Sequence, residues 1–390
     1  MPSEPVAAAS GAALPAPPQV LCLGEALVDR LGPPGGDPAT DHPCDDRLGG
    51  APANVACGLA RLGTPVAFLG RLGRDPIGDA FAALFAARGV DTRALQWDER
   101  LPSRIVLVRR DAAGERSFEG FAGGAGAVGG FAAGGEGGDL AGAAAASDAA
   151  GASAAQFADQ ALDAAALSAA LGPLLAQARW LLVGTIPLAS SAAASALQLA
   201  CHQAAAAGVA LALDVNWRPT FWDAAADPAS GPDLEAIAVI RPLLEQAALL
   251  KCAREEAEWL FGSADAAAVS AALPQRPAVV VSDGGARLSW CGGGLSGTLP
   301  AFPVNLVDST GAGDAFTAGL LHRLCVEPQL LMRPAGVGDS GDAAEAVDPA
   351  AITAALRFAA ACGAIVCQGA GAIDPQPDPG QVQTFLAAQV

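Results

Sequence analysis

The sequence has no tyrosine, only three histidines, and far fewer basic than acidic residues. Its 22 Lys and Arg residues stand against 40 Asp and Glu residues, which gives a formal net charge of −18. A negative charge of this size argues against nucleic acid and anionic membrane surfaces as partners. An anionic ligand would have to be attracted by local features, such as helix N-termini, a metal ion or a few Arg and Lys side chains.

Paired cysteines and long apolar runs are also missing. The nine cysteines are scattered without a CxxC pair, which favours buried small side chains in a reducing cytosol over disulfides or a zinc site. Every apolar stretch is interrupted by Gly, Pro or charge before it reaches the length of a membrane span. Residues 1–18 are rich in Ala and Pro and lack a basic start, which predicts a disordered tail rather than a signal peptide. We therefore expect a cytoplasmic protein.

The 390 residues are 52% hydrophobic, enough for one large α/β domain or two ordinary ones. Apolar patterns predict strands at residues 20–22, 66–70, 105–109, 116–118, 180–184, 209–215, 248–251, 278–282, 286–290 and 302–307. Helical spacing predicts helices at residues 54–62, 77–88, 157–178, 191–207, 232–246, 255–261, 315–324 and 351–366. From about residue 180 the two types alternate, which predicts a mainly parallel sheet covered on both faces. In such a sheet ligands gather at the carboxyl ends of the strands, where we expect Asp214, Lys251, Ser282 and Asp308.

Two segments carry no such pattern. Residues 122–155 are Gly/Ala-rich and of low complexity, with few side chains to pack, which predicts a mobile insertion. Residues 334–349 form an acidic, Gly-containing loop.

The most informative segment is D-S-T-G-A-G-D-A-F at residues 308–316. A strand, a tight glycine turn and a helix start together make an anion-binding device, because the first N–H groups and the helix dipole face outward. Glycine lets that backbone approach a phosphate closely. Asp314 would repel a phosphate, but it makes sense as a base that takes a proton from an attacking hydroxyl. The alternative is an Asp that caps an ordinary helix.

This segment resembles the C-terminal signature of the PfkB, or ribokinase-like, carbohydrate kinases. A second segment, G-G-A-P-A-N-V-A at residues 49–56, is similar to the family's N-terminal signature, most closely that of the fructokinases. The resemblance covers residues 20–375 and implies one kinase domain at residues 19–380. It further implies a three-layer α/β/α fold with a mostly parallel sheet, and a small β lid from about residues 30–48 and 100–121.

The resemblance implies roles for individual residues on the sugar side. It assigns sugar binding to Asp29, which ends G-E-A-L-V-D, and to Gly49, Gly50 and Asn54. Carboxylate and amide groups suit vicinal hydroxyls, because one accepts hydrogen bonds and the other both donates and accepts. Taken alone, Asp29 could be a solvated loop acid and Asn54 a helix cap.

The resemblance also implies a nucleotide side. Gly311, Ala312 and Gly313 would form the anion hole, with Asp314 as the catalytic base. Asp214-x-Asn216-x-Arg218 is similar to a segment whose Asn and Arg face the phosphates, although an Arg218–Asp214 pair is the alternative. The nucleotide would also lie along Ser282, Gly284 and Gly285, at the end of a predicted strand.

Three metal positions follow from the same resemblance. Glu256 would hold Mg²⁺ through water, with an ordinary surface Glu as the alternative. Asp308 and Thr310 fall near a monovalent cation site, so K⁺ is an expected further cofactor.

The chain departs from the family pattern in three places. Ala253 stands where relatives carry Asn or Ser, and Ala360 stands where relatives carry Asn. In the lid region, no Arg follows Phe121 until Arg179. We expect an ATP-dependent sugar kinase with fructose as substrate, whose partners are the sugar, ATP and a second copy paired through the lid. The alternatives are a kinase of another sugar or a nucleoside, and a kinase-like protein that binds a nucleotide or a partner without turnover.

Overall fold

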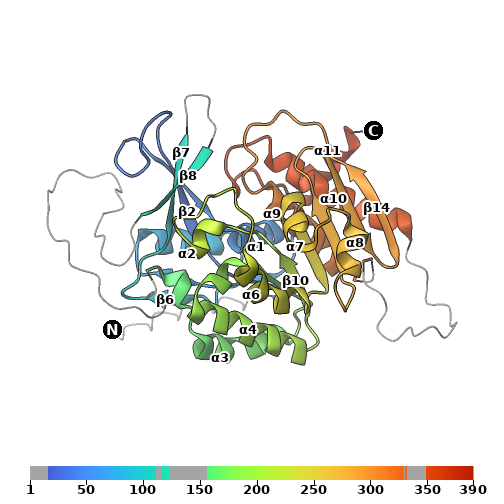
Figure 1. The fold of residues 1–390 in the computed structure, drawn as a ribbon, viewed down its shortest axis with the longest axis horizontal. Helices are drawn as coiled ribbons and strands as arrows, with labels where there is room; N and C mark the ends of the chain where they lie inside the picture. Colours follow the sequence, from blue (N-terminus) through green and yellow to red (C-terminus); the bar gives the residue numbers. More distant parts are fainter. Residues whose placement is uncertain (1–15, 111–115, 123–155, 329, 332–347, 390) are drawn as a thin grey trace, which may run out of the picture.

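The structure of the protein is a computed structural model that describes residues 16–110, 116–122, 156–328, 330–331 and 348–389 (Figure 1). Four predicted features lie wholly or mostly outside the described residues. These are the N-terminal tail at 1–18, the turn at 111–114, the insertion at 122–155 and the acidic loop at 334–349.

A central sheet of eight strands organises the fold, in the order β14-β13-β12-β11-β10-β9-β1-β4. The six strands from β4 to β12 are parallel, and β13 and β14 add an antiparallel edge. This confirms the predicted α/β class with a mostly parallel sheet. The strands are β1 (Val20–Leu23), β4 (Val66–Leu69), β9 (Trp180–Val183), β10 (Ala210–Asp214), β11 (Leu249–Ala253), β12 (Ala278–Ser282), β13 (Arg287–Gly292) and β14 (Leu295–Pro300).

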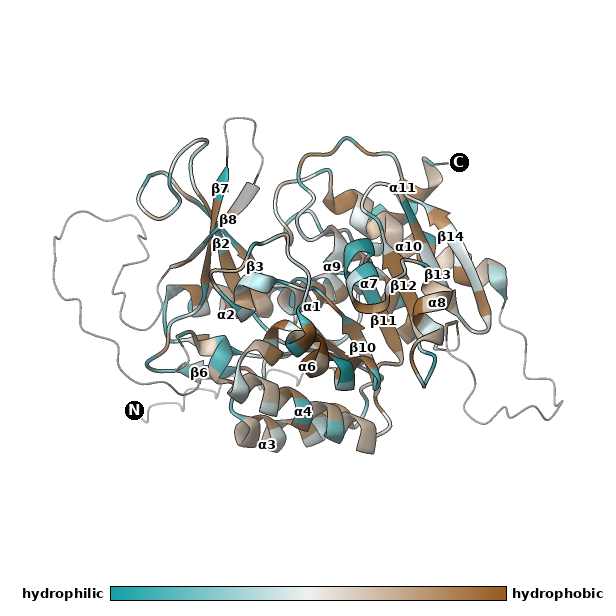
Figure 2. Cartoon of the chain, in the orientation of Figure 1, coloured by the Kyte–Doolittle hydropathy of each residue, from teal (hydrophilic) through white to brown (hydrophobic). Residues whose placement is uncertain are grey.

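Helices cover both faces of this sheet, because successive side chains of a buried strand point to opposite sides. In β1, Val20 and Cys22 pack with α1, α9 and α10, whereas Leu21 and Leu23 pack with α3 and α4. Figure 2 shows the strands β10 to β12 as a hydrophobic layer. The helices are α1 (Ala51–Arg61), α2 (Pro76–Arg88), α3 (Ala164–Leu175), α4 (Ser191–Ala206), α5 (Pro219–Trp222), α6 (Leu234–Leu244), α7 (Arg254–Phe261), α8 (Ala266–Ala271), α9 (Ala312–Val326), α10 (Pro349–Val366) and α11 (Pro379–Ala387), with 3₁₀ turns at Ala158–Ala161 and Ile186–Ala189.

A second sheet, which we call the lid sheet, stands at one end of the molecule (Figure 1). Its strands in order are β3 (Asp45–Gly49), β2 (Leu27–Leu31), β7 (Ile105–Arg110) and β8 (Arg116–Ala122). β2 pairs antiparallel with β3 and parallel with β7, and β7 and β8 form the predicted hairpin. Two short strands, β5 (Arg71–Gly73) and β6 (Gln96–Asp98), form a third, separate sheet.

The strand predicted at residues 302–307 is wrong. β14 ends at Pro300, and the chain then runs irregularly to Gly311. Pro303 has no N–H for a ladder, and Leu306 and Val307 are 67% and 62% exposed, so this apolar run does not fill a core position. Asp308 therefore lies in a loop, while Asp214, Lys251 and Ser282 lie on strands near their carboxyl ends.

The predicted helix at residues 157–178 is shorter than expected. A 3₁₀ turn at Ala158–Ala161 precedes α3, which begins at Ala164 after its cap Asp163. The Asp163 carboxylate accepts hydrogen bonds from the N–H groups of Ala165 and Ala166, which fixes that start.

By length and composition alone, α10 is the one helix among the described residues that could cross a membrane. It packs instead against α9 in the core, where Leu356, Ala359 and Cys362 are buried. An apolar core helix passes the same test, so α10 is a core helix in this fold.

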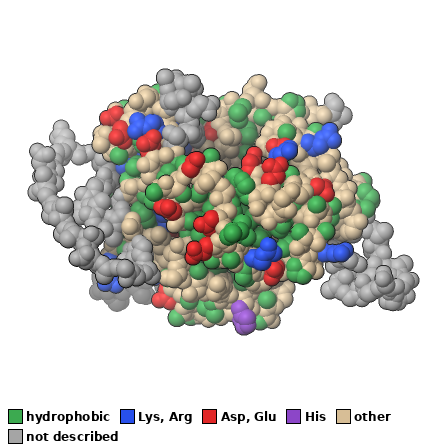
Figure 3. Space-filling model, viewed as in Figure 1, with side chains coloured by type: hydrophobic (Ala, Val, Ile, Leu, Met, Phe, Trp, Pro, Cys, Tyr) green, Lys and Arg blue, Asp and Glu red, His purple; other side chains and the backbone are tan. Residues whose placement is uncertain are grey.

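Acidic side chains are spread over the face drawn in Figure 3, and Lys and Arg lie there in small separate groups. This distribution agrees with the net charge of −18. A phosphate-bearing ligand would therefore have to be attracted by the local geometry of a site rather than by the general surface.

Candidate active site

An open cleft of about 510 Å³ lies between the lid sheet and the carboxyl ends of the parallel strands. Its walls bring together predicted residues that are far apart in the sequence: Asp29, Gly50, Asn54, Asn216, Arg218, Thr310, Gly311, Gly313 and Asp314. Seven other predicted site residues do not line this cleft: Gly49, Ala312, Glu256, Ser282, Gly284, Gly285 and Asp308.

The N-terminus of α9 opens into this cleft. Its cap, Gly311, has a φ of 76°, and a Cβ added there would lie 2.4 Å from the Cβ of Ala372. A Cβ added at Gly313 would lie 3.0 Å from Nζ of Lys251. Gly311 is required for steric reasons, whereas a Cβ at Gly313 would crowd the end of the Lys251 side chain. The first N–H groups of the helix lie where an anion could reach them.

Asp314 lies in the first turn of α9, half-buried at the wall of the cleft. Nδ2 of Asn54 donates a hydrogen bond to Oδ2 of Asp314 over 2.7 Å. Burial raises the pKa of Asp314 to about 6, although the bond from Asn54 and the charges of Lys251 and Arg218 oppose this rise. An acid with this pKa is ionised at neutral pH and still basic enough to accept a proton.

Both capping alternatives for these residues are wrong. Gly311 is the cap of α9, and the Asp314 side chain bonds Asn54 instead of its own helix. Gly50 is the cap of α1, so Asn54 lies inside that helix and points its amide across to α9.

Lys251 was expected at this edge of the sheet, but the sequence analysis gave it no part in the chemistry. Its ammonium group donates to both oxygens of Asp214, at 3.1 and 2.9 Å, and Asp214 also accepts a bond of 3.0 Å from the hydroxyl of Thr317. Burial lowers the pKa of Lys251, but the adjacent Asp214 carboxylate outweighs this and holds it above the ordinary value. A lysine within an apolar, buried strand was the signal that could have revealed it.

Asn216 and Arg218 follow β10 and reach the cleft. Asn216 has a φ of 43°, in the left-handed region, and Nη1 of Arg218 donates to the backbone oxygen of Trp217 over 2.8 Å. Asp214 is paired with Lys251, so the alternative of an Arg218–Asp214 pair is wrong.

Glu256 is 6% exposed and holds the backbone beside the cleft. Its two oxygens accept hydrogen bonds of 2.7 Å each, from the N–H groups of Trp217 and Ala253. Burial raises the pKa of this carboxyl group. Its alternative as an ordinary surface Glu is therefore wrong. Among the described residues, no group of three or more His, Cys, Asp or Glu side chains is placed to hold a metal ion.

On the sugar side, the backbone excludes a side chain at Gly50, whereas a side chain at Gly49 would crowd a carboxylate. A Cβ at Gly49 would lie 3.0 Å from Oδ2 of Asp29, and a Cβ at Gly50, where φ is 98°, would lie 2.6 Å from the backbone oxygen of Glu25. Glu25 is 3% exposed, lines the cleft, and accepts a bond from the N–H of Ala51 over 3.1 Å. Burial raises its pKa to about 8, a feature that the sequence pattern did not reveal.

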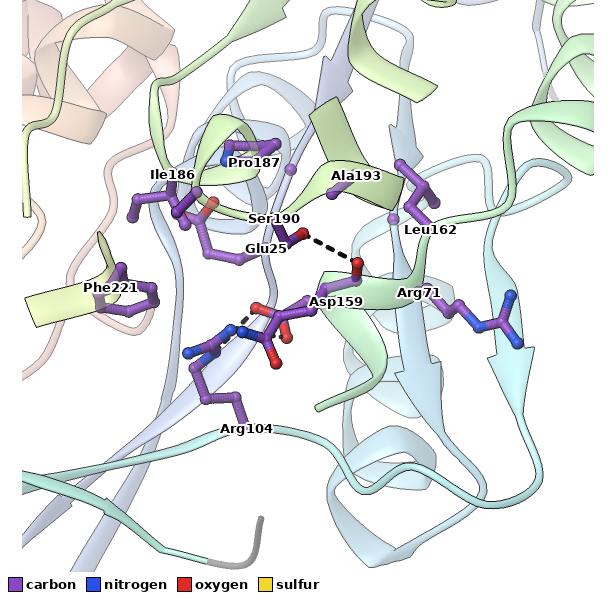
Figure 4. Close-up of a pocket in the computed structure, with 14 residues that line it drawn as sticks. Glu25, Arg71, Arg104, Asp159, Leu162, Ile186, Pro187, Ser190, Ala193 and Phe221 are labelled. Carbon is purple, nitrogen blue, oxygen red and sulfur yellow. Dashed lines mark hydrogen bonds and ion pairs between the residues drawn. The ribbon is translucent and has the colours of Figure 1, made fainter. Parts of the chain in front are cut away.

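A smaller cavity beside the cleft is lined by a buried arginine, Arg104, which directly precedes β7 (Figure 4). Arg104 is 3% exposed and makes two bonds to Asp159, at 2.9 and 3.1 Å. The rings of Phe121, Phe157 and Phe221 lie within 4.9 Å of its guanidinium carbon. The Arg104–Asp159 pair, surrounded by these rings, is held in place between the lid sheet and the central sheet and is not free to reach a sugar.

The remaining predicted nucleotide residues lie at the end of β12. The Ser282 hydroxyl donates to the backbone oxygen of Cys252 over 3.4 Å, and added Cβ atoms at Gly284 and Gly285 would meet no atom within 4 Å. Ala360 lies half-buried on α10 and packs against the core.

An acid and an amide facing an anion-binding helix start, with a buried lysine beside them, define the site of an enzyme that transfers phosphoryl groups to hydroxyls. Residues 17–132 and 140–379 match the pfkB family of carbohydrate kinases. The chain belongs to this family and is a carbohydrate kinase.

Relatives and solved structures agree with this assignment. The chain is 28% identical to fructokinase-1 of Oryza sativa subsp. japonica over 94% of its own length and 97% of the relative's, and 29% identical to a Klebsiella pneumoniae fructokinase over 94% and 99%. A Xylella fastidiosa fructokinase with bound ATP superposes with a TM-score of 0.70 at 26% identity, covering 95% of this chain and 98% of that one. A Vibrio cholerae O395 fructokinase double mutant, in a fructose, ADP and potassium ion bound form, gives 0.69 at 25% identity, covering 96% and 99%.

Proposed function

We propose that the protein transfers the γ-phosphoryl group of ATP to a hydroxyl of fructose. The observation that carries this proposal is the pairing of Asp314 with Asn54 at the glycine-capped start of α9. This pairing supports a role for Asp314 as the base and for Asn54 as the amide that binds the hydroxyl, beside an anion-binding helix start. The similarity to fructokinases over almost the whole chain supports the choice of sugar.

In the proposed reaction, Asp29 and Asn54 hold the hydroxyls of the sugar against the lid sheet. Asp314 takes the proton of the attacking hydroxyl as the new O–P bond forms and the bond to the leaving diphosphate breaks. The first N–H groups of α9, together with Lys251 and Arg218, stabilise the negative charge that develops on the phosphoryl group. The lid sheet shields the reacting atoms from water.

A divalent cation such as Mg²⁺ would supply further charge neutralisation at the phosphates. The carboxylate of Glu256, the predicted ligand, already accepts two backbone hydrogen bonds, so it suits a contact through water rather than direct coordination. Mg²⁺ commonly binds in this way, with most of its ligands from phosphate and water. Ser282, Gly284 and Gly285 are proposed to lie along the nucleotide.

A riboside is the second candidate substrate, because part of the cleft wall is apolar. Val106, Val108 and Phe118 of the lid sheet and Phe221 line the cleft, and the Phe121 ring lies 5.1 Å from those of Phe118 and Phe221. An aromatic wall of this kind could stack on a base.

Pairing of two copies through the lid stays a prediction, as does a cytoplasmic location.

Comparison of a sugar and a nucleoside tests the proposal. We expect MgATP turnover with fructose to exceed turnover with adenosine, and Asp314→Asn to remove it. The matched control Asp79→Asn alters an exposed acid on α2 outside the cleft and should leave turnover unchanged. Turnover with adenosine alone would replace the first candidate with the second, and ATP binding without turnover on any acceptor would favour a binding protein.

A further inference from the structure

One arginine of the lid sheet reaches across to the loop that carries the anion hole. Arg47 lies on β3, directly opposite Asp29 in the strand pairing, and two residues before Gly49. Its Nη1 lies 3.4 Å from Oδ2 of Asp308, a residue more than 250 positions away in the sequence. Its Nε and Nη2 both donate to Asp45 on the same strand, at 2.9 and 2.5 Å, which fixes the direction of the side chain.

Asp308 is the organising residue of this loop, with its side chain 4% exposed. Oδ1 accepts hydrogen bonds from the N–H and the hydroxyl of Thr310, at 2.9 and 2.7 Å. Oδ2 accepts a bond of 2.9 Å from the N–H of Gly371, in the segment after α10. A buried carboxylate of this kind needs a positive charge beside it.

The segment after α10 continues this chain of contacts to the anion hole. A Cβ at Gly371 would lie 3.4 Å from Nη1 of Arg47, so the guanidinium group lies against that backbone. The next residue, Ala372, packs so closely on Gly311 that a Cβ there would lie 2.4 Å away. Arg47 therefore lies against Asp308 and against the backbone of Gly371, which directly precedes the residue that packs on the cap of α9.

The family resemblance predicted a K⁺ site near Asp308 and Thr310. The carboxylate of Asp308 does not fit that expectation, because N–H and O–H donors already surround its oxygens and a guanidinium group lies beside it. K⁺ requires oxygen ligands that are free to coordinate it, whereas the N–H donors of a guanidinium group bind a carboxylate oxygen directly.

We propose that Arg47 is a positioning residue that takes the place of a monovalent cation at Asp308 and couples the lid sheet to the anion hole. This proposal rests on the proposed kinase function. It predicts that phosphoryl transfer by this protein does not need K⁺. It also predicts that removing the arginine creates a need for an added cation.

The test compares the unmodified protein with Arg47→Met, Arg47→Lys and Arg30→Met. Arg30 is a matched control, because it forms a salt bridge with Asp46 in the same lid sheet and does not reach the loop at Asp308. Fructose phosphorylation is measured with MgATP in tetramethylammonium chloride, in KCl and with millimolar guanidinium chloride, at constant ionic strength.

We expect the unmodified protein to have the same kcat in all three salts. Arg47→Met should lose at least about tenfold in kcat in tetramethylammonium chloride, the loss typical of one charge-assisted contact. KCl or guanidinium should restore much of that loss, and the KM for fructose should change less than kcat. Arg47→Lys should retain most activity without K⁺, and Arg30→Met should show no response to K⁺.

Hydrogen exchange provides a readout that does not depend on turnover. We expect peptides that contain the N–H groups of Thr310 and Gly371 to exchange faster in Arg47→Met, and K⁺ to slow them again. An unmodified protein that requires K⁺, or an Arg47→Met variant with unchanged kcat and exchange in every salt, would overturn the proposal. If no acceptor is phosphorylated at all, the proposed function fails, and the exchange data alone decide the role of Arg47.

Discussion

The hydrogen bond from Asn54 to Asp314 makes a measurable prediction about pH. Asp314 acts as a base only when it is ionised, so kcat/KM should fall as the pH drops through its pKa of about 6. The Asn54 amide donates to the ionised form over 2.7 Å and therefore lowers this pKa. Without that donor, the protonated form is favoured and the acid limb of the pH profile moves to higher pH.

The size of the shift follows from the energy of the bond. A hydrogen bond to a charged group contributes about 1.5–3 kcal/mol, and one pKa unit corresponds to about 1.4 kcal/mol. In Asn54→Ala the acid limb of kcat/KM should therefore move up by about one to two units. The variant should be impaired most near pH 6 and recover toward pH 9, apart from a uniform loss of sugar affinity.

The assay is the initial rate at low fructose concentration across pH 5 to 9, with saturating MgATP. Asp29→Asn is the matched control, because it removes another group of the same cleft wall and a negative charge. Asp29→Asn should raise the KM for fructose, and it should not move the acid limb of kcat/KM to higher pH. If the limb of Asn54→Ala coincides with that of the unmodified protein, the pairing with Asp314 does not set the pKa of the base.

Three further substitutions and one chelation experiment have expected outcomes. Asp314→Asn should lower kcat by at least ~10²-fold with sugar binding little changed, as steady-state kinetics and calorimetry would show. Lys251→Met should lower kcat by about 10²-fold, because it removes a positive charge at the anion hole; an unchanged kcat would exclude that role. In a urea titration, Gly50→Ala should lower the free energy of unfolding by about 1–3 kcal/mol, because φ is 98° and the new Cβ would meet Glu25. The control Gly89→Ala, which has open space around it, should lower the free energy of unfolding by less. EDTA should abolish turnover and Mg²⁺ should restore it; turnover that persists in EDTA would contradict a metal-assisted transfer.

Local patterns were sufficient to predict most of the fold. The six parallel strands are short and apolar, β12 (Ala278–Ser282) is rich in β-branched valine, and glycine marks several helix ends. The failure at residues 302–307 has a physical cause, because an apolar run does not show whether a core receives it. Leu306 and Val307 are exposed there.

The contacts that make the site functional could not be predicted in the same way. Asn54 and Asp314 were each predicted to bind or react, but the bond between them joins residues 260 positions apart, and no spacing rule reaches that far. The Lys251–Asp214 pair joins neighbouring strands whose order is a property of the whole sheet. The caged Arg104 depends on rings from three separate segments, so only the folded chain shows that it is held in place.

The most direct test of the proposed function is ADP release by the purified protein with MgATP, across fructose, glucose, ribose, fructose 6-phosphate and adenosine. Asp314→Asn serves as the control in each case. We predict strong release with fructose that the substitution removes, since the base and the anion hole act on the same hydroxyl. Equal release from the substituted protein, or ATP binding with no release on any acceptor, would contradict the account.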